Sequence, residues 1–223
     1  MKPAAIVFDA YGTLFDIHAP TARAAAPLGE KAESLSNMWR MKQLQYTWLR
    51  SLMPAYADFW QVTGDALDYS LAAHGIDDPA LREQLMALYR TVDAYDDAAP
   101  MLNDLKAAGI PASILSNGEP SMLDDAVRAN GFSLLLDSVL SVDAEKIFKP
   151  APNIYEMAAA RYGGVRGDVV FVSANAWDAA GGANFGFTVV WINRFGQPME
   201  RIPGTPAAEI TTLADLAATV AGL

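Results

Sequence analysis

The feature that most constrains the fold is a series of short apolar runs, rich in Val, Ile and Phe, separated by segments with helical periodicity. Such runs are typical of buried strands, and their alternation with helices is typical of a parallel sheet covered on both faces. The expected strands are Ala5–Phe8, Pro111–Leu115, Leu134–Val142, Val169–Val172 and Thr188–Ile192. The expected helices are Ala98–Ala108, Pro120–Asn130, Pro152–Tyr162 and Asp178–Phe185, with Gly109 and Gly131 as helix-ending residues.

Residues 17–96 interrupt this alternation, because only helical patterns occur there. These helices are expected at Lys31–Met53, Tyr56–His74 and Pro79–Val92. We therefore predict a Rossmann-like α/β core domain formed by residues 1–16 and 97–223, and an inserted all-helical cap domain formed by residues 17–96. The C-terminal tail is expected to add a short edge at Glu209–Ile210 and a helix at Leu213–Val220.

Composition excludes several classes of function. The chain has 16 Lys and Arg against 26 Asp and Glu, a net charge of −10, and no basic run, so we expect no nucleic-acid or membrane partner. It has no cysteine and two histidines, His18 and His74, which excludes thiol catalysis and makes a histidine-rich metal site improbable. The apolar run at the start is short and ends at Asp9, unlike a signal peptide, so we expect a cytoplasmic protein.

Polar residues follow several of the expected strands directly. In a parallel sheet these strand ends share one edge, which is where α/β proteins bind ligands. Each segment also has an ordinary interpretation: a capping carboxylate, a polar turn or a solvated lysine. The candidates are Asp9, Ser116, Asn117, Ser173, Asn175 and Asp178, together with Lys149, which Pro150 follows.

Taken together and in order, these segments resemble the haloacid dehalogenase-like superfamily, and its 2-haloacid dehalogenase branch most closely. The matching segments cover nearly the whole chain. They are Asp9-Ala10-Tyr11-Gly12-Thr13-Leu14-Phe15-Asp16, Trp39-Arg40-x-Lys42-Gln43-Leu44-x-Tyr46, Leu115-Ser116-Asn117-Gly118, Phe148-Lys149-Pro150 and Ser173-x-Asn175-x-Trp177-Asp178.

The resemblance implies a mechanism in which Asp9 displaces the halide from a small 2-haloalkanoate and forms an ester that water hydrolyses. Lys149 would keep Asp9 ionised, because an opposite charge lowers a carboxylate pKa. The resemblance implies further roles for other residues. Thr13 and Ser116 would position the reacting groups, and Arg40 and Asn117 would stabilise the halide. The pocket would be formed by Tyr11, Leu44, Phe59 and Trp177, the water would be held by Ser173, Asn175 and Asp178, and Tyr155 would act near the site.

Tyr11 separates dehalogenation from phosphate-ester hydrolysis. Phosphatases of the superfamily carry a second Asp at this position, which protonates the leaving alkoxide. Tyr11 is a poor acid near neutral pH, whereas a halide leaves without a proton. Mg²⁺ needs several hard oxygen ligands, and the chain has Tyr11 and Asn175 where carboxylates would serve. We therefore expect no metal and no cofactor.

Two alternatives remain open from the sequence. The first is a magnesium-dependent small-molecule phosphatase of the same superfamily, against which Tyr11 argues. The second is a non-catalytic binding protein on this fold, against which the joint presence of Asp9, Lys149 and Asp178 argues. The resemblance implies a homodimer, for which the Met- and Trp-rich helix of the expected cap, with Met38 and Met41, offers an apolar surface.

Overall fold

A computed structural model describes residues 3–223 and contains one six-stranded, fully parallel sheet, with the strand order β3-β2-β1-β4-β5-β6. This confirms the predicted fold class. The strands are β1 (Ala5–Phe8), β2 (Ala112–Ser116), β3 (Ser138–Ser141), β4 (Val169–Ser173), β5 (Thr188–Ile192) and β6 (Ala208–Ile210). Every residue of β1, β2 and β4 is buried, which explains why these runs are mostly apolar and do not alternate with exposed polar residues.

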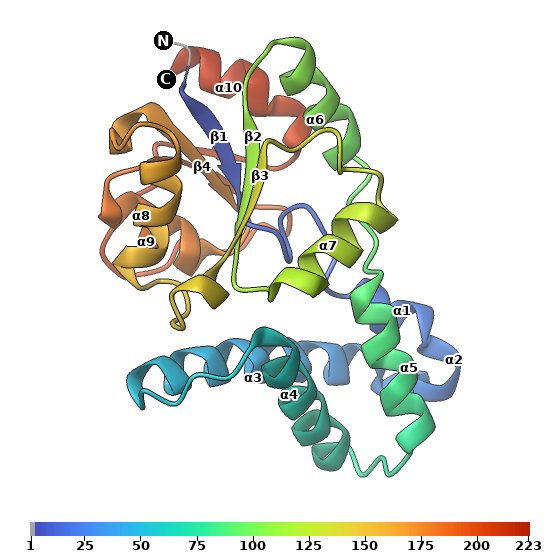
Figure 1. The fold of residues 1–223 in the computed structure, drawn as a ribbon. Coiled ribbons are helices and arrows are strands. Elements are labelled where there is room, and N and C mark those ends of the chain that lie inside the picture. The colour runs from blue at the N-terminus through green and yellow to red at the C-terminus, as the bar shows by residue number, and fades with distance from the viewer. Residues whose placement is uncertain (1–2) are drawn as a thin grey trace.

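Helices cover both faces of the sheet (Figure 1). On one side lie α6 (Ala98–Ala107), α7 (Pro120–Ala129) and α10 (Leu216–Gly222), and on the other lie α8 (Pro152–Arg161) and α9 (Ala176–Phe185). The chain proceeds from β1 outward to β3 and then returns to β4 on the other side of β1. Such a reversal opens a crevice between the carboxyl ends of the two central strands, β1 and β4.

The third predicted strand was too long. Leu134–Val142 was expected, but β3 begins at Ser138. The residues before it form a turn, in which the N–H of Leu135 donates to the carbonyl of Phe132 at 2.9 Å. Leu134, although apolar, is 81% exposed. The predicted helix ends at Gly109 and Gly131 are confirmed, because both glycines have positive φ angles (62° and 71°) that other residues rarely adopt.

The inserted segment is all-helical, as predicted, and lies beyond the carboxyl edge of the sheet, while the two chain ends lie together at the opposite end (Figure 1). The helices are α1 (Ala19–Arg23), α2 (Ala25–Leu28), α3 (Ala32–Leu52), α4 (Phe59–Ala73) and α5 (Pro79–Arg90). The short α1 and α2 were not predicted. The helix α4 begins later than expected because Asp58 caps it, accepting a hydrogen bond from the N–H of Gln61 at 2.8 Å. Single 3₁₀ turns occur at Gly29–Lys31, Val142–Ala144, Arg166–Asp168 and Leu213–Asp215.

The two chain crossings between the core and the helical insert pair with each other. Asp16 N–H donates to the Asp93 carbonyl at 2.8 Å, and Tyr95 N–H donates to the Leu14 carbonyl at 2.9 Å. We propose that the domain boundaries expected at residues 17 and 96 correspond to this paired crossing. Among the helices of residues 3–223, none is long and apolar enough to cross a membrane.

Candidate active site

Asp9 follows β1 directly, at the crevice between the two central strands. Gly12, with a φ angle of 96°, allows the chain to turn sharply after it. The turn places Thr13 back against the carboxylate, and Thr13 Oγ1 donates to Asp9 Oδ2 at 3.1 Å. Thr13 Oγ1 also accepts from the N–H of Ala174 at 2.8 Å, so the hydroxyl proton is directed toward Asp9.

Lys149 brings a cation between two carboxylates. Its Nζ donates to Asp9 Oδ1 at 3.1 Å and to Asp178 Oδ2 at 2.9 Å, and its side chain is 1% exposed. Burial alone would lower the pKa of Lys149, but the charges of Asp178 and Asp9 outweigh burial, so the pKa lies above its ordinary value. Lys149 is therefore a permanent positive charge at the crevice.

Asp178 lies on the first turn of α9 and is fully buried. Its Oδ1 accepts from the Tyr155 hydroxyl at 2.7 Å, and its Oδ2 accepts from Ser173 Oγ at 3.1 Å as well as from Lys149. Burial raises the pKa of Asp178, an effect that the charge of Lys149 opposes. Burial and the nearby Asp178 charge also raise the pKa of Tyr155 well above its ordinary range, so Tyr155 acts as a neutral donor.

A second chain of contacts joins Asp9 to the helical insert. Asn175 Nδ2 donates to Asp9 Oδ2 at 2.8 Å, and Arg40 Nη2 donates to Asn175 Oδ1 at 3.0 Å and to the Tyr11 carbonyl at 3.2 Å. Arg40 lies on α3 and is half-buried, so it does not lie on a solvated helix face. A cation from the insert thus lies one side chain away from Asp9.

A cavity of about 310 Å³ opens beside this second chain of contacts. Arg40, Leu44 and Met41 of α3 line it on one side, and Asn175 and Trp177 line it on the other. The Trp177 ring meets the Trp48 ring edge-on at 5.3 Å between centroids, which joins α9 to α3. The predicted pocket residues Arg40, Leu44 and Trp177 therefore lie together.

Four other predicted binding residues lie outside that cavity lining. Tyr11 and Phe59 are buried and pack against each other, with ring centroids 5.9 Å apart. Ser116 Oγ accepts from the N–H of Gly118 at 3.0 Å, and Asn117 Oδ1 accepts from the N–H of Lys149 at 3.0 Å. Asn117 thus fixes the backbone from which the Lys149 ammonium projects, a contact that the sequence did not suggest.

Gln43 was quoted in the sequence pattern but was not assigned to the site. Its Oε1 accepts from Arg40 Nη1 at 2.8 Å, and its Nε2 donates to Thr63 Oγ1 at 2.7 Å and to the Tyr89 hydroxyl at 3.1 Å. This buried amide orients Arg40 from within the insert. The sequence signal that could have identified Gln43 is its four-residue spacing from Trp39 and Thr47, which places all three on one helix face.

The residues at Asp9 do not fit a magnesium ion. The Lys149 ammonium already bridges Asp9 and Asp178, where a cation shared by those carboxylates would lie. The residue two positions after Asp9 is the buried Tyr11, whose pKa burial raises well above its ordinary range. A neutral phenol and an ammonium cannot replace the hard anionic oxygens that Mg²⁺ prefers.

Known proteins share this sequence and arrangement. The haloacid dehalogenase-like hydrolase family profile matches residues 3–186. The chain is 49% identical to (S)-2-haloacid dehalogenase 4A of Burkholderia cepacia over 88% of this chain and 85% of that protein. It is 44% identical to (S)-2-haloacid dehalogenase 1 of Pseudomonas sp. (strain CBS-3), over 95% and 94% of the two chains.

A crystal structure of the L-2-haloacid dehalogenase of Xanthobacter autotrophicus, with chloropropionic acid covalently bound, superposes with a TM-score of 0.92. The sequences are 35% identical, and the match covers 99% of each chain. Similarity at this level and coverage, joined to the geometry around Asp9, places this chain in the (S)-2-haloacid dehalogenase family of the haloacid dehalogenase-like hydrolases.

Proposed function

We propose that this protein hydrolyses short-chain (S)-2-haloacids to (R)-2-hydroxy acids, with inversion, through an ester on Asp9. The observation that carries the proposal is the placement of Asp9 between two cationic groups. The Lys149 ammonium contacts one carboxylate oxygen directly, and the Arg40 guanidinium reaches the other through Asn175. This arrangement holds a carboxylate nucleophile next to a positive group that can receive an anion.

In the first step an oxygen of Asp9 attacks the halogen-bearing carbon, and the halide leaves with the electron pair of the carbon–halogen bond. The Lys149 ammonium and the Thr13 hydroxyl each donate a hydrogen bond to the Asp9 carboxylate and orient it. Arg40 and the Asn117 amide stabilise the departing halide, and Leu44 and Trp177 bound the cavity in which the chain of the substrate lies. Because a halide needs no proton, the neutral Tyr11 suffices at its position.

In the second step water attacks the carbonyl carbon of the Asp9 ester, and the ester C–O bond breaks on the Asp9 side. Ser173, Asn175 and Asp178 hold the water, and Asp178, which stays ionised after Asp9 is esterified, accepts its proton. The raised pKa that burial causes brings Asp178 closer to the range of an effective base. The alkoxide takes the proton back from Asp178 as the hydroxy acid leaves, and the new Asp9 carboxyl releases the second proton of the water to solvent, which restores both carboxylates.

Isotope labelling tests this path. In a single turnover with excess enzyme in H₂¹⁸O, the product of (S)-2-chloropropionate should carry no label, and the label should appear in the peptide containing Asp9. The Asp9→Asn variant should release no halide, provided that mass spectrometry excludes its deamidation. Labelled product in the first turnover, with unlabelled Asp9, would show direct attack by water and reduce Asp9 to a base.

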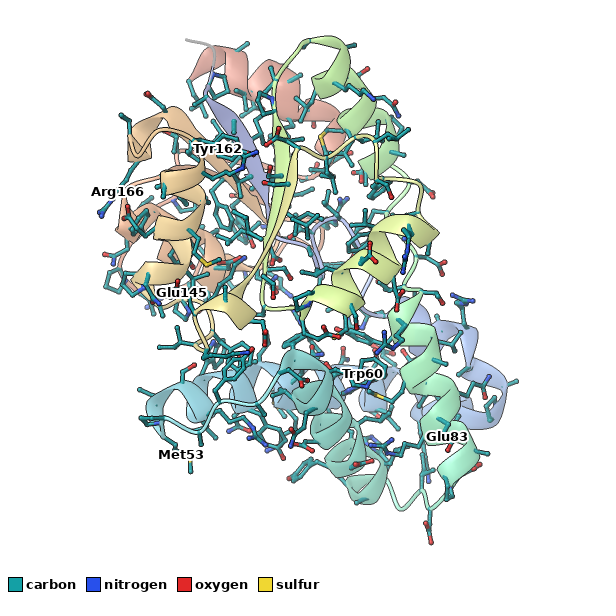
Figure 2. The ribbon with its side chains drawn as sticks, viewed as in Figure 1. Met53, Trp60, Glu83, Glu145, Tyr162 and Arg166 are labelled. Atoms are coloured by element: carbon teal, nitrogen blue, oxygen red, sulfur yellow. The ribbon has the colours of Figure 1, made fainter. Side chains whose placement is uncertain are left out.

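A finer part of the proposal concerns assembly and location. The outer surface of α3 carries the exposed apolar side chains Met41, Leu49 and Leu52, with Met53 just beyond its end. Met53 projects away from the core (Figure 2). We propose that this surface joins two copies in a cytoplasmic homodimer. Light scattering in solution should give about twice the 23.9 kDa chain mass, and a monomer mass would contradict the dimer.

A further inference from the structure

Arg194 lies at a junction of four segments, although it does not line the cavity. It follows the carboxyl end of β5, and its guanidinium forms a two-pronged ion pair with Asp97, at 2.8 and 2.9 Å. The same guanidinium lies over the ring of Tyr95, 4.0 Å from its centroid. Asp97 and Tyr95 belong to the second crossing between the helical insert and the core.

The remaining contact of Arg194 reaches the turn that carries the nucleophile. Nη2 donates to the carbonyl of Thr13 at 3.1 Å, across 181 positions of sequence. Thr13 in turn donates from Oγ1 to Asp9 and accepts from the N–H of Ala174. Two groups of this one residue are therefore held by three partners: its carbonyl by Arg194, and its hydroxyl by Asp9 and Ala174.

Threonine transmits a backbone position to its hydroxyl more faithfully than most residues, because branching at Cβ restricts rotation about χ1. A force that fixes the Thr13 carbonyl therefore fixes the direction of Oγ1. The Asp97 carboxylate fixes the guanidinium itself, since it also accepts from Thr212 Oγ1 at 2.8 Å and from the N–H of Leu213 at 2.9 Å. Arg194 is thus anchored to a rigid part of the core on one side and to the nucleophile turn on the other.

We propose that Arg194 is a positioning residue for the dehalogenation: by binding the Thr13 carbonyl, it holds the Thr13 hydroxyl on the Asp9 carboxylate. The effect expected on kcat rests on the proposed function. The effect expected on the turn that carries Asp9 rests on the geometry alone. Arg194 does not contact Asp9 and does not itself line the cavity, although Tyr95, over which its guanidinium lies, does line it. Its loss should therefore reduce kcat by a larger factor than it changes KM.

The chain offers a matched control in Arg166. Arg166 also donates to a backbone carbonyl, that of Phe185, at 3.1 Å, and it pairs with the carboxylate of Glu156 at 3.0 Å. Its guanidinium likewise lies 4.0 Å from the centroid of an aromatic ring, that of Phe185. Arg166 lies on the outer surface of the core, away from the cap helices (Figure 2), so Arg166→Gln removes the same kinds of contact at a distance from Asp9.

The first arm of the experiment needs no substrate. Amide hydrogen exchange should be faster in the peptide spanning residues 9–16 of Arg194→Gln, on the order of ten-fold, the loss expected for one hydrogen bond. This turn is closed by the N–H of Gly12 on the Phe15 carbonyl and the N–H of Leu14 on the Ala10 carbonyl, which report on it directly. Arg166→Gln should leave this peptide unchanged. Equal exchange in both variants would overturn the proposal, even if the wild-type protein released no halide.

The second arm measures halide release. Arg194→Gln should lower kcat on the order of ten-fold with a smaller change in KM, while Arg166→Gln keeps the wild-type kcat. Arg194→Lys keeps the charge but loses the planar fork, so it should restore the rate in part. In a double-mutant cycle, Arg194→Gln should add little to the effect of Thr13→Val, because both act through one hydroxyl. Fully additive effects would assign Arg194 a purely structural role.

Should Arg194→Gln fail to fold, Asp97→Asn provides the same test. It weakens the anchor of the guanidinium without removing the cation. Faster exchange in residues 9–16 and a lower kcat would support the proposal, and an unchanged turn in a folded Asp97→Asn protein would contradict it. Absence of halide release from the wild-type protein, with faster exchange in the Arg194 variant, would instead refute the proposed function and leave the positioning role standing.

Discussion

At the scale of single residues, the site is organised by one buried ammonium. Lys149 places one positive charge against both Asp9 and Asp178, two carboxylates in a place where burial opposes an uncompensated charge. Asn117 holds the backbone of Lys149. Tyr155 donates to the Asp178 oxygen that Lys149 leaves available, and Ser173 shares the other oxygen with Lys149. Removing the Lys149 ammonium would leave two buried carboxylates without this counter-charge.

The same ammonium predicts that activity is independent of metal. Because Lys149 Nζ occupies the position between Asp9 and Asp178, excess EDTA should not change the rate of halide release. Magnesium-dependent turnover of p-nitrophenyl phosphate, lost in EDTA and restored by Mg²⁺, would favour the phosphatase alternative. A folded protein without either activity would favour the non-catalytic one.

At the scale of elements, α3 (Ala32–Leu52) connects the helical insert to the chemistry of the core. Its buried face carries Trp39, Gln43 and Thr47, and Gln43 directs Arg40 toward Asn175 at the start of α9. The helix therefore places the charged side chain of Arg40, from the insert, beside Asn175 at the end of a core strand. The site is complete only when α3 packs against the core.

Arg40→Ala should lower kcat on the order of 10²-fold, because preorganised charge facing a departing anion contributes a few kcal/mol to transition-state stabilisation. Arg40→Lys should recover part of the rate. Arg50→Ala is the matched control, since Arg50 lies on the same helix but pairs with Asp65, at 2.8 Å. Halide release by Arg40→Ala at the rate of the Arg50→Ala control would refute the assigned role.

At the scale of the whole molecule, Asp97 joins the second crossing, the end of β5 and the C-terminal turn at Leu213–Asp215. Burial raises the pKa of Asp97, but hydrogen bonds from Arg194, Leu213 and Thr212 lower it by more, so the pKa lies below its ordinary value. The ionised carboxylate therefore stabilises the folded state above the unfolded pKa of about 3.9, and this contribution is lost as the pH falls through the lower, folded pKa.

Urea unfolding as a function of pH measures this contribution. The free energy of unfolding of Asp97→Asn should fall below that of the wild type at neutral pH, and the difference should shrink as the pH falls below about 4. The exposed neighbour Asp96 provides the control variant, Asp96→Asn, which should follow the wild-type curve. A difference between wild type and Asp97→Asn that is constant with pH would show that the charge of Asp97 does not stabilise the fold.

The local pattern of the chain was sufficient to predict the parallel sheet, the helical insert, and the residues that follow the strands. Hydrophobic periodicity and turn residues act over a few positions, so β5 was located to the residue and α3 to within one residue at each end. Asp9 was identifiable because it follows a buried strand directly, and Lys149 and Asp178 because their segments, taken in order, resemble motifs of the haloacid dehalogenase-like superfamily. The α1 and α2 helices were missed because neither is long enough for its periodicity to appear.

The contacts within the site were decided by the packing of segments that are distant in the sequence. Lys149 meets Asp9 across 140 positions, and Arg194 meets Thr13 across 181, so no local pattern reports either contact. Packing between elements also decides three details of the site. Tyr155 donates a hydrogen bond to Asp178, Gln43 orients Arg40, and Phe59 lies outside the cavity lining. Propensity determines where a strand or helix forms, but burial and hydrogen-bond partners exist only once the elements have packed against one another.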